Sequence, residues 1–253
     1  MQVANSIIVV TGGASGIGRA LCQRFAREGA KAIVVADVDI LGAERVAADV
    51  GGLAIETDVT RERDLRRLVE RTLGEHGRID LFCSNAGIAI DGDEHTTDAD
   101  WERCWHVNVM AHVLAARTVL PSMIEQGSGY LLQTVSAAGL LTHIGSASYA
   151  VTKHASLAFA EWLAIAYGHR GIKVSALCPQ GVRTNMLNRG GERAAFLLEG
   201  ALKPEQVAEV VVQGLADERF LILPHPEVAE YFRRKAGDYD RWLKGMRRLR
   251  TTI

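Results

Sequence analysis

A glycine-rich segment, Thr11-Gly12-Gly13-Ala14-Ser15-Gly16-Ile17-Gly18, stands between a short apolar run and a stretch with helical character. Glycines allow a tight turn and let the backbone approach a ligand closely. A helix start offers unpaired N–H groups and the positive end of the helix dipole, and both favour a pyrophosphate. The strand-before, helix-after context therefore indicates a dinucleotide-binding turn rather than a merely tight strand–helix turn.

Short apolar runs alternate with helical stretches along the rest of the chain. The runs are continuously apolar, as strands buried on both faces of a parallel sheet are. The pattern predicts an α/β fold with a single doubly wound parallel-sheet (Rossmann) domain over residues 1–253, about seven strands and helices on both faces. We expect strands at 6–11, 32–36, 53–57, 79–84, 129–135, 172–177 and 220–223, and helices at 16–28, 40–49, 61–76, 98–126, 149–168 and 204–216.

The composition is that of an ordinary soluble globular protein, with 48% hydrophobic and 23% charged residues. A net charge of −1 argues against nucleic-acid binding through a global field. No apolar stretch approaches the ~18 residues that a membrane span needs, and the N-terminus lacks a signal-peptide pattern, so we expect a cytoplasmic protein. The four cysteines have no C-x-x-C spacing, and we expect neither a metal site nor a disulfide.

Two segments stand outside the alternation. Residues 184–203 carry apolar side chains around Gly190-Gly191, which suits a mobile lid or a surface helix packed on the core. Residues 225–253 form a basic extension with eight Lys or Arg against four Asp or Glu. Its apolar residues recur at helical spacing, which favours packing on the domain or on a partner subunit over contact with a membrane surface. They are Tyr239, Trp242, Leu243, Met246 and Leu249.

Asp37 ends the second predicted strand, 19 residues after Gly18. An acid in this place accepts hydrogen bonds from the adenosine ribose and repels a 2′-phosphate, so NAD is favoured over NADP. The alternative is that Asp37 caps the helix that starts near Ile40, and one carboxylate can do both.

Tyr149 and Lys153 lie four residues apart, and Ser136 precedes Tyr149 by thirteen. A helix brings residues four apart onto one face, so the phenol and the ammonium are neighbours. The cation favours the phenolate and lowers the pKa of the phenol, which makes the pair an acid–base device. By itself the pair is also typical of a surface tyrosine beside a solvated lysine.

Taken together, these motifs resemble the short-chain dehydrogenase/reductase family over nearly the whole chain. Residues 11–18 resemble its T-G-x-x-x-G-x-G loop, and Asp58-Val59 its acid-plus-apolar pair against adenine. Residues 84–87 resemble its N-N-A-G segment with serine first, and residues 179–184 its P-G-x-x-x-T segment with Gln180 at the glycine position. The resemblance implies cofactor contacts at Gly12, Ser15, Gly16, Ile17, Gly18, Asp37, Asp58, Val59, Asn85, Ala86, Gly87, Tyr149, Lys153, Pro179, Gly181, Val182 and Thr184.

The resemblance also implies a catalytic set of Asn108, Ser136, Tyr149 and Lys153. Tyr149 would be the general acid or base, and Lys153 would lower its pKa and bind the nicotinamide ribose. Ser136 would bind the substrate oxygen, and Asn108 would sit in a helix distortion that holds a water linking Lys153 to solvent. In the alternative readings Ser136 caps a turn, Asn108 is an ordinary buried amide and Thr184 caps the lid.

The substrate side is predicted from the residues around this set. Candidate substrate contacts are Ser136, Ala138, His143, Tyr149, Gln180 and Met186, although His143 is equally compatible with a solvated loop. An apolar pocket is expected from Leu140, Leu141, Ile144, Met186, Leu187 and Phe196.

The sequence thus favours an NAD-dependent oxidoreductase that interconverts a hydrophobic secondary alcohol and its ketone. One alternative is an NAD(H)-binding interaction or sensor protein without turnover, and another is a reductase of an imine or an activated alkene. The resemblance implies a homodimer or homotetramer paired through the helices at 98–126 and 149–168.

Overall fold

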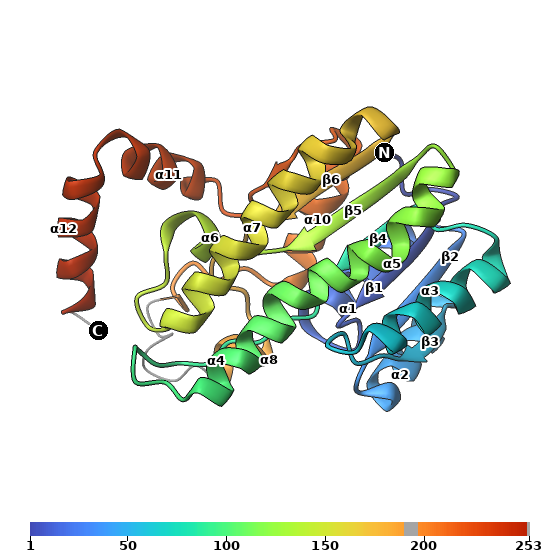
Figure 1. Ribbon diagram of the computed structural model, residues 1–253, viewed down its shortest axis with the longest axis horizontal. Helices are drawn as coiled ribbons and strands as arrows, with labels where there is room; N and C mark the ends of the chain where they lie inside the picture. Colours follow the sequence, from blue (N-terminus) through green and yellow to red (C-terminus); the bar gives the residue numbers. More distant parts are fainter. Residues whose placement is uncertain (190–196, 252–253) are drawn as a thin grey trace.

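The computed structural model of the protein describes residues 1–189 and 197–251. In this part of the chain a parallel sheet of seven strands has the order β3-β2-β1-β4-β5-β6-β7, as Figure 1 shows. The predicted fold class is confirmed. The strands are β1 (Ile7–Thr11), β2 (Ala32–Asp37), β3 (Leu53–Glu56), β4 (Leu81–Ser84), β5 (Gly129–Thr134), β6 (Ile172–Leu177) and β7 (Leu221–Ile222).

Helices cover both faces of the sheet. One core joins it to α3 (Glu62–His76), α5 (Ala111–Glu125) and α7 (Ala147–Tyr167), and the other joins it to α1 (Gly16–Arg27), α2 (Ile40–Val50) and α10 (Pro204–Ala216). Other α-helices of the described residues are α4 (Asp98–Trp105), α6 (Ala138–Leu141), α8 (Asn185–Arg189), α11 (Glu227–Gly237) and α12 (Tyr239–Arg250).

Strand β1 shows why the strand sequences are continuously apolar. Successive side chains of a strand point to opposite faces. Val9 packs in the core under α3, α5 and α7, whereas Ile8 and Val10 pack in the core under α1, α2 and α10. Both faces are therefore dry, and every position of the strand is buried.

The strand order changes direction between β1 and β4, since β2 and β3 lie to one side of β1 and β4 to β7 lie to the other. Parallel strands end at one edge, and ligands of such sheets bind in the crevice beyond the carboxyl ends at this point. The glycine-rich segment follows β1, and residues 85–87 follow β4.

The helix expected at 98–126 is not continuous, and it is interrupted where the family resemblance implied a helix distortion at Asn108. A π-helical turn, His106–Met110, separates α4 from α5, and the Ala111 N–H donates to the His106 carbonyl five residues back. Helix α7 begins at Ala147 rather than at Tyr149, because Ser146 is its N-cap and accepts from the Tyr149 N–H at 3.2 Å. The prediction included no helix at α6 or α11, whereas α8 lies in the segment 184–203 that was expected to be a lid or a surface helix.

The segment Asp98–Glu125 is long and apolar enough to cross a membrane by length and composition alone, contrary to the expectation that no such stretch exists. Just over half of its apolar window, 56%, is buried against the rest of the protein. Val119 and Met123 of this segment are fully enclosed in the core. A core helix of an α/β domain passes the same length test.

Helices α11 and α12 lie at one side of the molecule, beyond α6, and α12 runs at an angle to α11 (Figure 1). They correspond to the predicted basic extension, and α12 confirms the helical spacing of its apolar residues. The predicted lid is described only in part, since Gly190, Gly191 and Phe196 lie outside the described residues.

Candidate active site

The glycine-rich segment turns between β1 and α1 with two glycines at positive φ, +65° at Gly12 and +52° at Gly16. Side chains are excluded here, because a Cβ at Gly12 would lie 2.9 Å from the Ala86 Cα and a Cβ at Gly18 would overlap the Gly12 carbonyl oxygen. Ser15 occupies the N-cap of α1 without a side-chain hydrogen bond to the helix. The first N–H groups of α1 thus remain available as donors to a phosphate.

Asn85 ties this turn to the neighbouring strand ends. Its Nδ2 donates to the carbonyls of Thr11 at 3.0 Å and Gly12 at 3.3 Å. Its Oδ1 accepts from the Thr134 hydroxyl at 3.1 Å. One amide therefore fixes the ends of β1, β4 and β5 relative to one another. We call residues 12–17 and 85–87 the cofactor wall.

Asp37 supports the same turn from β2. Its carboxylate accepts from the Ala14 N–H and from the Asp39 N–H, both at 3.0 Å. The alternative that Asp37 caps α2 is wrong, because the N-cap of α2 is Asp39, which accepts from the Gly42 N–H at 2.9 Å.

Asp58 and Val59 lie at the end of β3, and both are engaged within the protein. The Asp58 carboxylate accepts from the Thr60 hydroxyl at 2.7 Å and pairs with Arg61 at 3.1 Å. Val59 is buried in the core.

Tyr149, Ser136 and Lys153 converge at the carboxyl ends of β4, β5 and β6. The Lys153 ammonium is almost fully buried, donates to the Thr134 carbonyl at 3.0 Å and lies 5.6 Å from the centre of the Tyr149 ring. Ser136 follows β5, where its hydroxyl accepts from the Ala138 N–H at 3.1 Å and contacts the Pro179 carbonyl at 3.4 Å. Ser136 thus also forms the turn contact that the alternative reading predicted.

Burial dominates the titration of this group. Desolvation raises the pKa of the Tyr149 phenol, and a hydrogen bond with Ser136 offsets part of that rise. Desolvation also lowers the pKa of Lys153 to about 8. The pKa of Tyr149 is thus raised in this structure, not lowered as expected, because desolvation by burial is the largest cause of its shift.

Asn108 lies in the π-helical turn, fully buried. Its Oδ1 accepts from the Ile88 N–H at 2.9 Å, and its Nδ2 donates to the Ile88 carbonyl at 2.9 Å and to the Thr152 hydroxyl at 3.1 Å. A Cβ at Gly87 would lie 3.4 Å from Asn108 Oδ1 and 3.5 Å from Lys153 Nζ, so these three residues meet at one point.

The segment after β6 closes the cavity from another side. Pro179 accepts from the Ala137 N–H at 2.8 Å, and the Gln180 N–H donates to His225 Nδ1 at 3.1 Å. The Thr184 methyl lies 3.1 Å from where a Gly16 Cβ would be, which places this segment over the glycine-rich turn.

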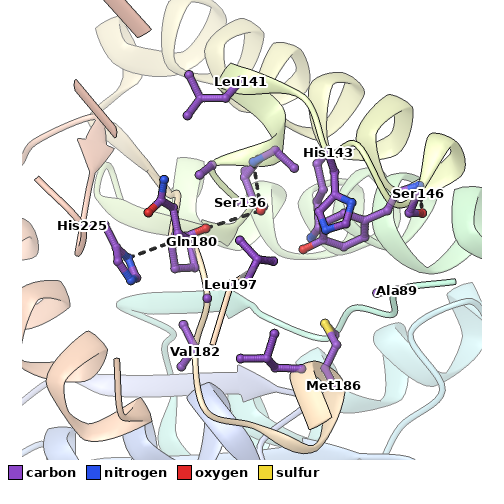
Figure 2. A pocket seen from close by; sticks show the side chains of 18 of the residues that line it. Ala89, Ser136, Leu141, His143, Ser146, Gln180, Val182, Met186, Leu197 and His225 are labelled. Atoms are coloured by element: carbon purple, nitrogen blue, oxygen red, sulfur yellow. Dashed lines mark hydrogen bonds between the residues drawn. The ribbon is translucent and has the colours of Figure 1, made fainter. Parts of the chain in front are cut away.

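These groups line a cavity of about 690 Å³. In Figure 2 Ser136 and His143 lie on one side of it and Met186 on the other. The His143 ring packs edge-on against the Tyr149 ring at 5.8 Å, so this histidine is not a solvated loop residue. All predicted substrate contacts line the cavity, and the predicted residues that do not line it are Gly18, Asp37, Asp58, Val59, Asn108 and Leu140.

The sequence analysis missed one side of this cavity, formed by the C-terminal helices. We call it the C-terminal wall, and its members are Tyr231, Arg234, Trp242, Met246 and Leu249. The helical spacing of the apolar residues in α12 was the available signal, but it does not say which surface the helix faces. His225 was missed as well.

Comparison with known proteins agrees with this geometry. A family model described as short chain dehydrogenase matches residues 6–194. The chain is 35% identical to the 1-deoxy-11-beta-hydroxypentalenate dehydrogenase of Streptomyces exfoliatus, covering 90% of this chain and 86% of the relative. It is 30% identical to the meso-2,3-butanediol dehydrogenase of Serratia marcescens, covering 88% and 92%. The crystal structure of a short chain dehydrogenase/reductase from Burkholderia phymatum in complex with NAD matches with a TM-score of 0.86 and 27% identity, covering 95% and 96%.

The fold and the cavity at the strand ends define an oxidoreductase of the Rossmann class. Within that class, the chain belongs to the short-chain dehydrogenase family. Members of this family bind NAD(P) and small substrates and are commonly oligomeric.

Proposed function

We propose that this protein is an NAD-dependent oxidoreductase that interconverts a hydrophobic secondary alcohol and its ketone. The observation that carries the proposal is the convergence of Ser136, Tyr149 and Lys153 in one cavity with the glycine-rich turn. The residues fit a dinucleotide, because the turn has no side chains at its closest approaches and the start of α1 keeps free donors. When bound, the nicotinamide supplies or accepts the hydride.

Tyr149 handles the proton. In reduction its phenol protonates the oxygen of the substrate, and in oxidation the phenolate removes the proton of the alcohol. In this proposal the Ser136 hydroxyl, which lies near enough to Tyr149 to offset part of the rise in its pKa, binds the same substrate oxygen. Lys153, fixed by the Thr134 carbonyl, supplies the cation that favours the phenolate once the proton has left.

Asn108 acts as a positioning residue in this proposal. Its amide holds the π-helical turn against residue 88 and α7, beside the Lys153 ammonium. The buried Ser156 hydroxyl donates to the Asn108 carbonyl at 2.6 Å, so both ends of this residue are tied down.

NAD is proposed over NADP because of Asp37. Its carboxylate lies at the end of β2 beside the turn, where a 2′-phosphate would meet a negative charge. The relative from Burkholderia phymatum, solved with NAD, is consistent with this choice.

The substrate is proposed to be apolar because Leu141, Ile144, Met186 and Leu187 line the cavity around Ser136 and Tyr149. The curated relatives are named as dehydrogenases of a hydroxypentalenate and of butanediol, compounds that carry hydroxyl groups. We therefore propose that the group oxidised by this protein is a hydroxyl on a secondary carbon.

We propose a homodimer or homotetramer paired through α4, α5 and α7. Trp105, Trp162 and Ile165 expose apolar surface on this face, with Ile165 82% exposed. Gel filtration at micromolar concentration should give a multiple of the 27.5 kDa chain, and elution as a monomer would contradict the proposal.

The test is a paired NAD and NADP activity screen over hydrophobic secondary alcohols with the wild-type protein and Tyr149→Phe. Loss of the phenolic proton should lower kcat by about 10²–10⁴-fold, with NADH affinity retained in a direct binding assay. Tyr167→Phe, at the far end of α7 and outside the cavity lining, is the matched control and should keep wild-type turnover. Near wild-type turnover by Tyr149→Phe would dismiss its role, whereas sound NADH binding without turnover of any alcohol would favour the sensor alternative.

A further inference from the structure

Helix α12 places an apolar stripe along the cavity of the candidate active site. Trp242, Met246 and Leu249 line the same cavity as Ser136 and Tyr149, and Tyr231 of α11 joins them. Residues 242, 246 and 249 lie on one face of a helix, since they are spaced by four and three positions. The stripe therefore belongs to the cavity, although it is more than ninety residues away in sequence from Tyr149.

The stripe is only partly covered by the protein itself. None of the residues of α12 is buried, and Tyr239 and Leu243 beside the stripe are 56% and 46% exposed. The other face of the helix carries Arg241, Lys244, Arg247 and Arg248. An amphipathic helix of this kind exposes its basic face to water, and its apolar face is stabilised by contact with other apolar groups.

Helix α11 holds α12 in this place. The Lys235 ammonium is buried, 6% exposed, and donates to the Leu140 carbonyl of α6 at 2.7 Å. It also lies 5.4 Å from the centre of the Tyr239 ring at the start of α12. Because α6 follows Ser136 by two residues, this contact links the C-terminal helices to the segment that carries the candidate catalytic serine.

The charged groups of this region disfavour an anionic occupant, because the carboxylates of Asp91, Glu199 and Glu227 line the same cavity. Arg234, the cation of the C-terminal wall, donates from Nε to Glu230 at 2.9 Å. The apolar residues Leu141, Met186 and Leu187 continue the surface from the stripe toward Tyr149. An apolar body that extends from a hydroxyl at Tyr149 can thus follow apolar side chains to α12.

We infer that the α12 stripe is a distal subsite for the apolar part of the substrate and makes this enzyme select alcohols with a long or bulky hydrocarbon body. The inference rests on the proposed function, since it takes the reacting hydroxyl to lie at Tyr149. A substrate that reaches α12 removes the stripe from water and gains affinity in proportion to the apolar area covered. A short alcohol gains nothing from it.

The experiment uses the full-length protein and unbranched 2-alkanols from 2-butanol to 2-dodecanol with NAD. The variants are Trp242→Ala with Met246→Ala, and Arg248→Ala on the basic face of α12 as the matched control. For the wild type and the control, kcat/KM should rise with chain length. The double variant should lose about 10-fold or more on the longest alcohol, mainly through KM, and stay near wild type on 2-butanol.

Two results would overturn the subsite and leave the proposed function intact. One is a wild-type kcat/KM that does not rise with chain length. The other is a loss of kcat/KM in the double variant that is equal for all alcohols. Should no alkanol be turned over, the screen of hydrophobic secondary alcohols described above decides the proposed function, and binding of the neutral apolar dye Nile red decides the subsite. A Kd raised at least about fivefold in the double variant alone supports it, and any other result overturns it.

Discussion

The cofactor wall and the C-terminal wall enclose the same cavity but are built in different ways. The cofactor wall consists of backbone turns fixed by Asn85 and Asp37, with glycines where a side chain would collide. The C-terminal wall consists of side chains on two helices, of which α12 has no buried residue. Hydrogen-bonded backbone tolerates little change, whereas half-buried or exposed helix side chains tolerate more, although Tyr231 and Trp242 of the C-terminal wall also pack against the core. The sequence of the cofactor wall is therefore strongly constrained by the fold. The sequence of the C-terminal wall is less constrained.

Replacing Gly18 with alanine tests the rigidity of the cofactor wall most directly. The new Cβ would overlap the Gly12 carbonyl, so we expect the free energy of unfolding to fall by about 3 kcal/mol or more and NADH affinity to be lost. Gly74 of α3 is the matched control, because nothing lies within 4 Å of its Cβ position. Gly74→Ala should gain about 0.5–1 kcal/mol. Urea unfolding measures both, and equal effects would break the contrast.

His112 is a buried residue of α5, four positions after Asn108. Both ring nitrogens are buried and have no hydrogen-bond partner among residues 1–189 and 197–251, and burial lowers the pKa of His112 to about 3. Since an unfolded imidazole has a pKa near 6.5, the unfolded chain binds the extra proton between these values. The contribution of His112 to the free energy of unfolding is therefore complete above about pH 6.5. It decreases by about 1.4 kcal/mol for each unit by which the pH is lowered from 6.5 toward 3.

His112→Leu should remove this loss. At pH 5 the wild type should have lost about 2 kcal/mol relative to the variant, whereas at pH 7 the two should unfold at similar urea concentrations. A difference that does not change between pH 7 and pH 5 would contradict a buried neutral imidazole.

Asp37→Asn tests whether the cofactor wall also selects the cofactor. Removing the charge should reduce the preference for NAD over NADP, measured as the ratio of kcat/KM values, by about 10-fold. Asp39→Asn changes an acid two residues away that caps α2, and should leave the ratio unchanged. A ratio that moves equally in both variants would assign the effect to general electrostatics.

Thr142 offers the smallest effect, on the substrate side of the cavity. Its φ of +84° is one that a β-branched residue rarely adopts, and it lines the cavity next to His143. In Thr142→Gly the free energy gained by removing this backbone strain should exceed the cost of the greater conformational entropy of the unfolded chain. The free energy of unfolding should therefore rise by about 1 kcal/mol. Thermal unfolding would show this, and a fall in stability would mean that the threonine side chain contributes more than the strain removes.

Much of the fold could be predicted because its rules are local. A dry strand must be apolar throughout, and a turn that packs against Ala86 must have glycine at position 12. The pairing of Tyr149 with Lys153 also followed from spacing, because one helix carries both, whereas Ser136 was expected beside them from the family resemblance.

The rest depends on what lies near in space. The π-helical turn has no local sequence signature, since Asn108 is held there by Ile88 and Thr152. The direction of the Tyr149 pKa shift depends on enclosure, which sequence spacing does not reveal. The C-terminal wall could not be predicted, because it depends on the hydrogen bond from Lys235 of α11 to the carbonyl of Leu140, which lies 95 residues earlier in the sequence.

The π-helical turn also determines how the side-chain faces of α4 and α5 are rotated relative to each other about their common axis. A turn closed by a bond to the fifth residue back holds one residue more than an α-helical turn, and each residue of an α-helix advances about 100°. Without that extra residue, the faces of α4 and α5 would be rotated against each other by this amount. Either Asn108 would swing away from Lys153, or Val119 and Met123 would leave the core. The insertion lets one rod satisfy both the packing of the sheet and the chemistry at its edge.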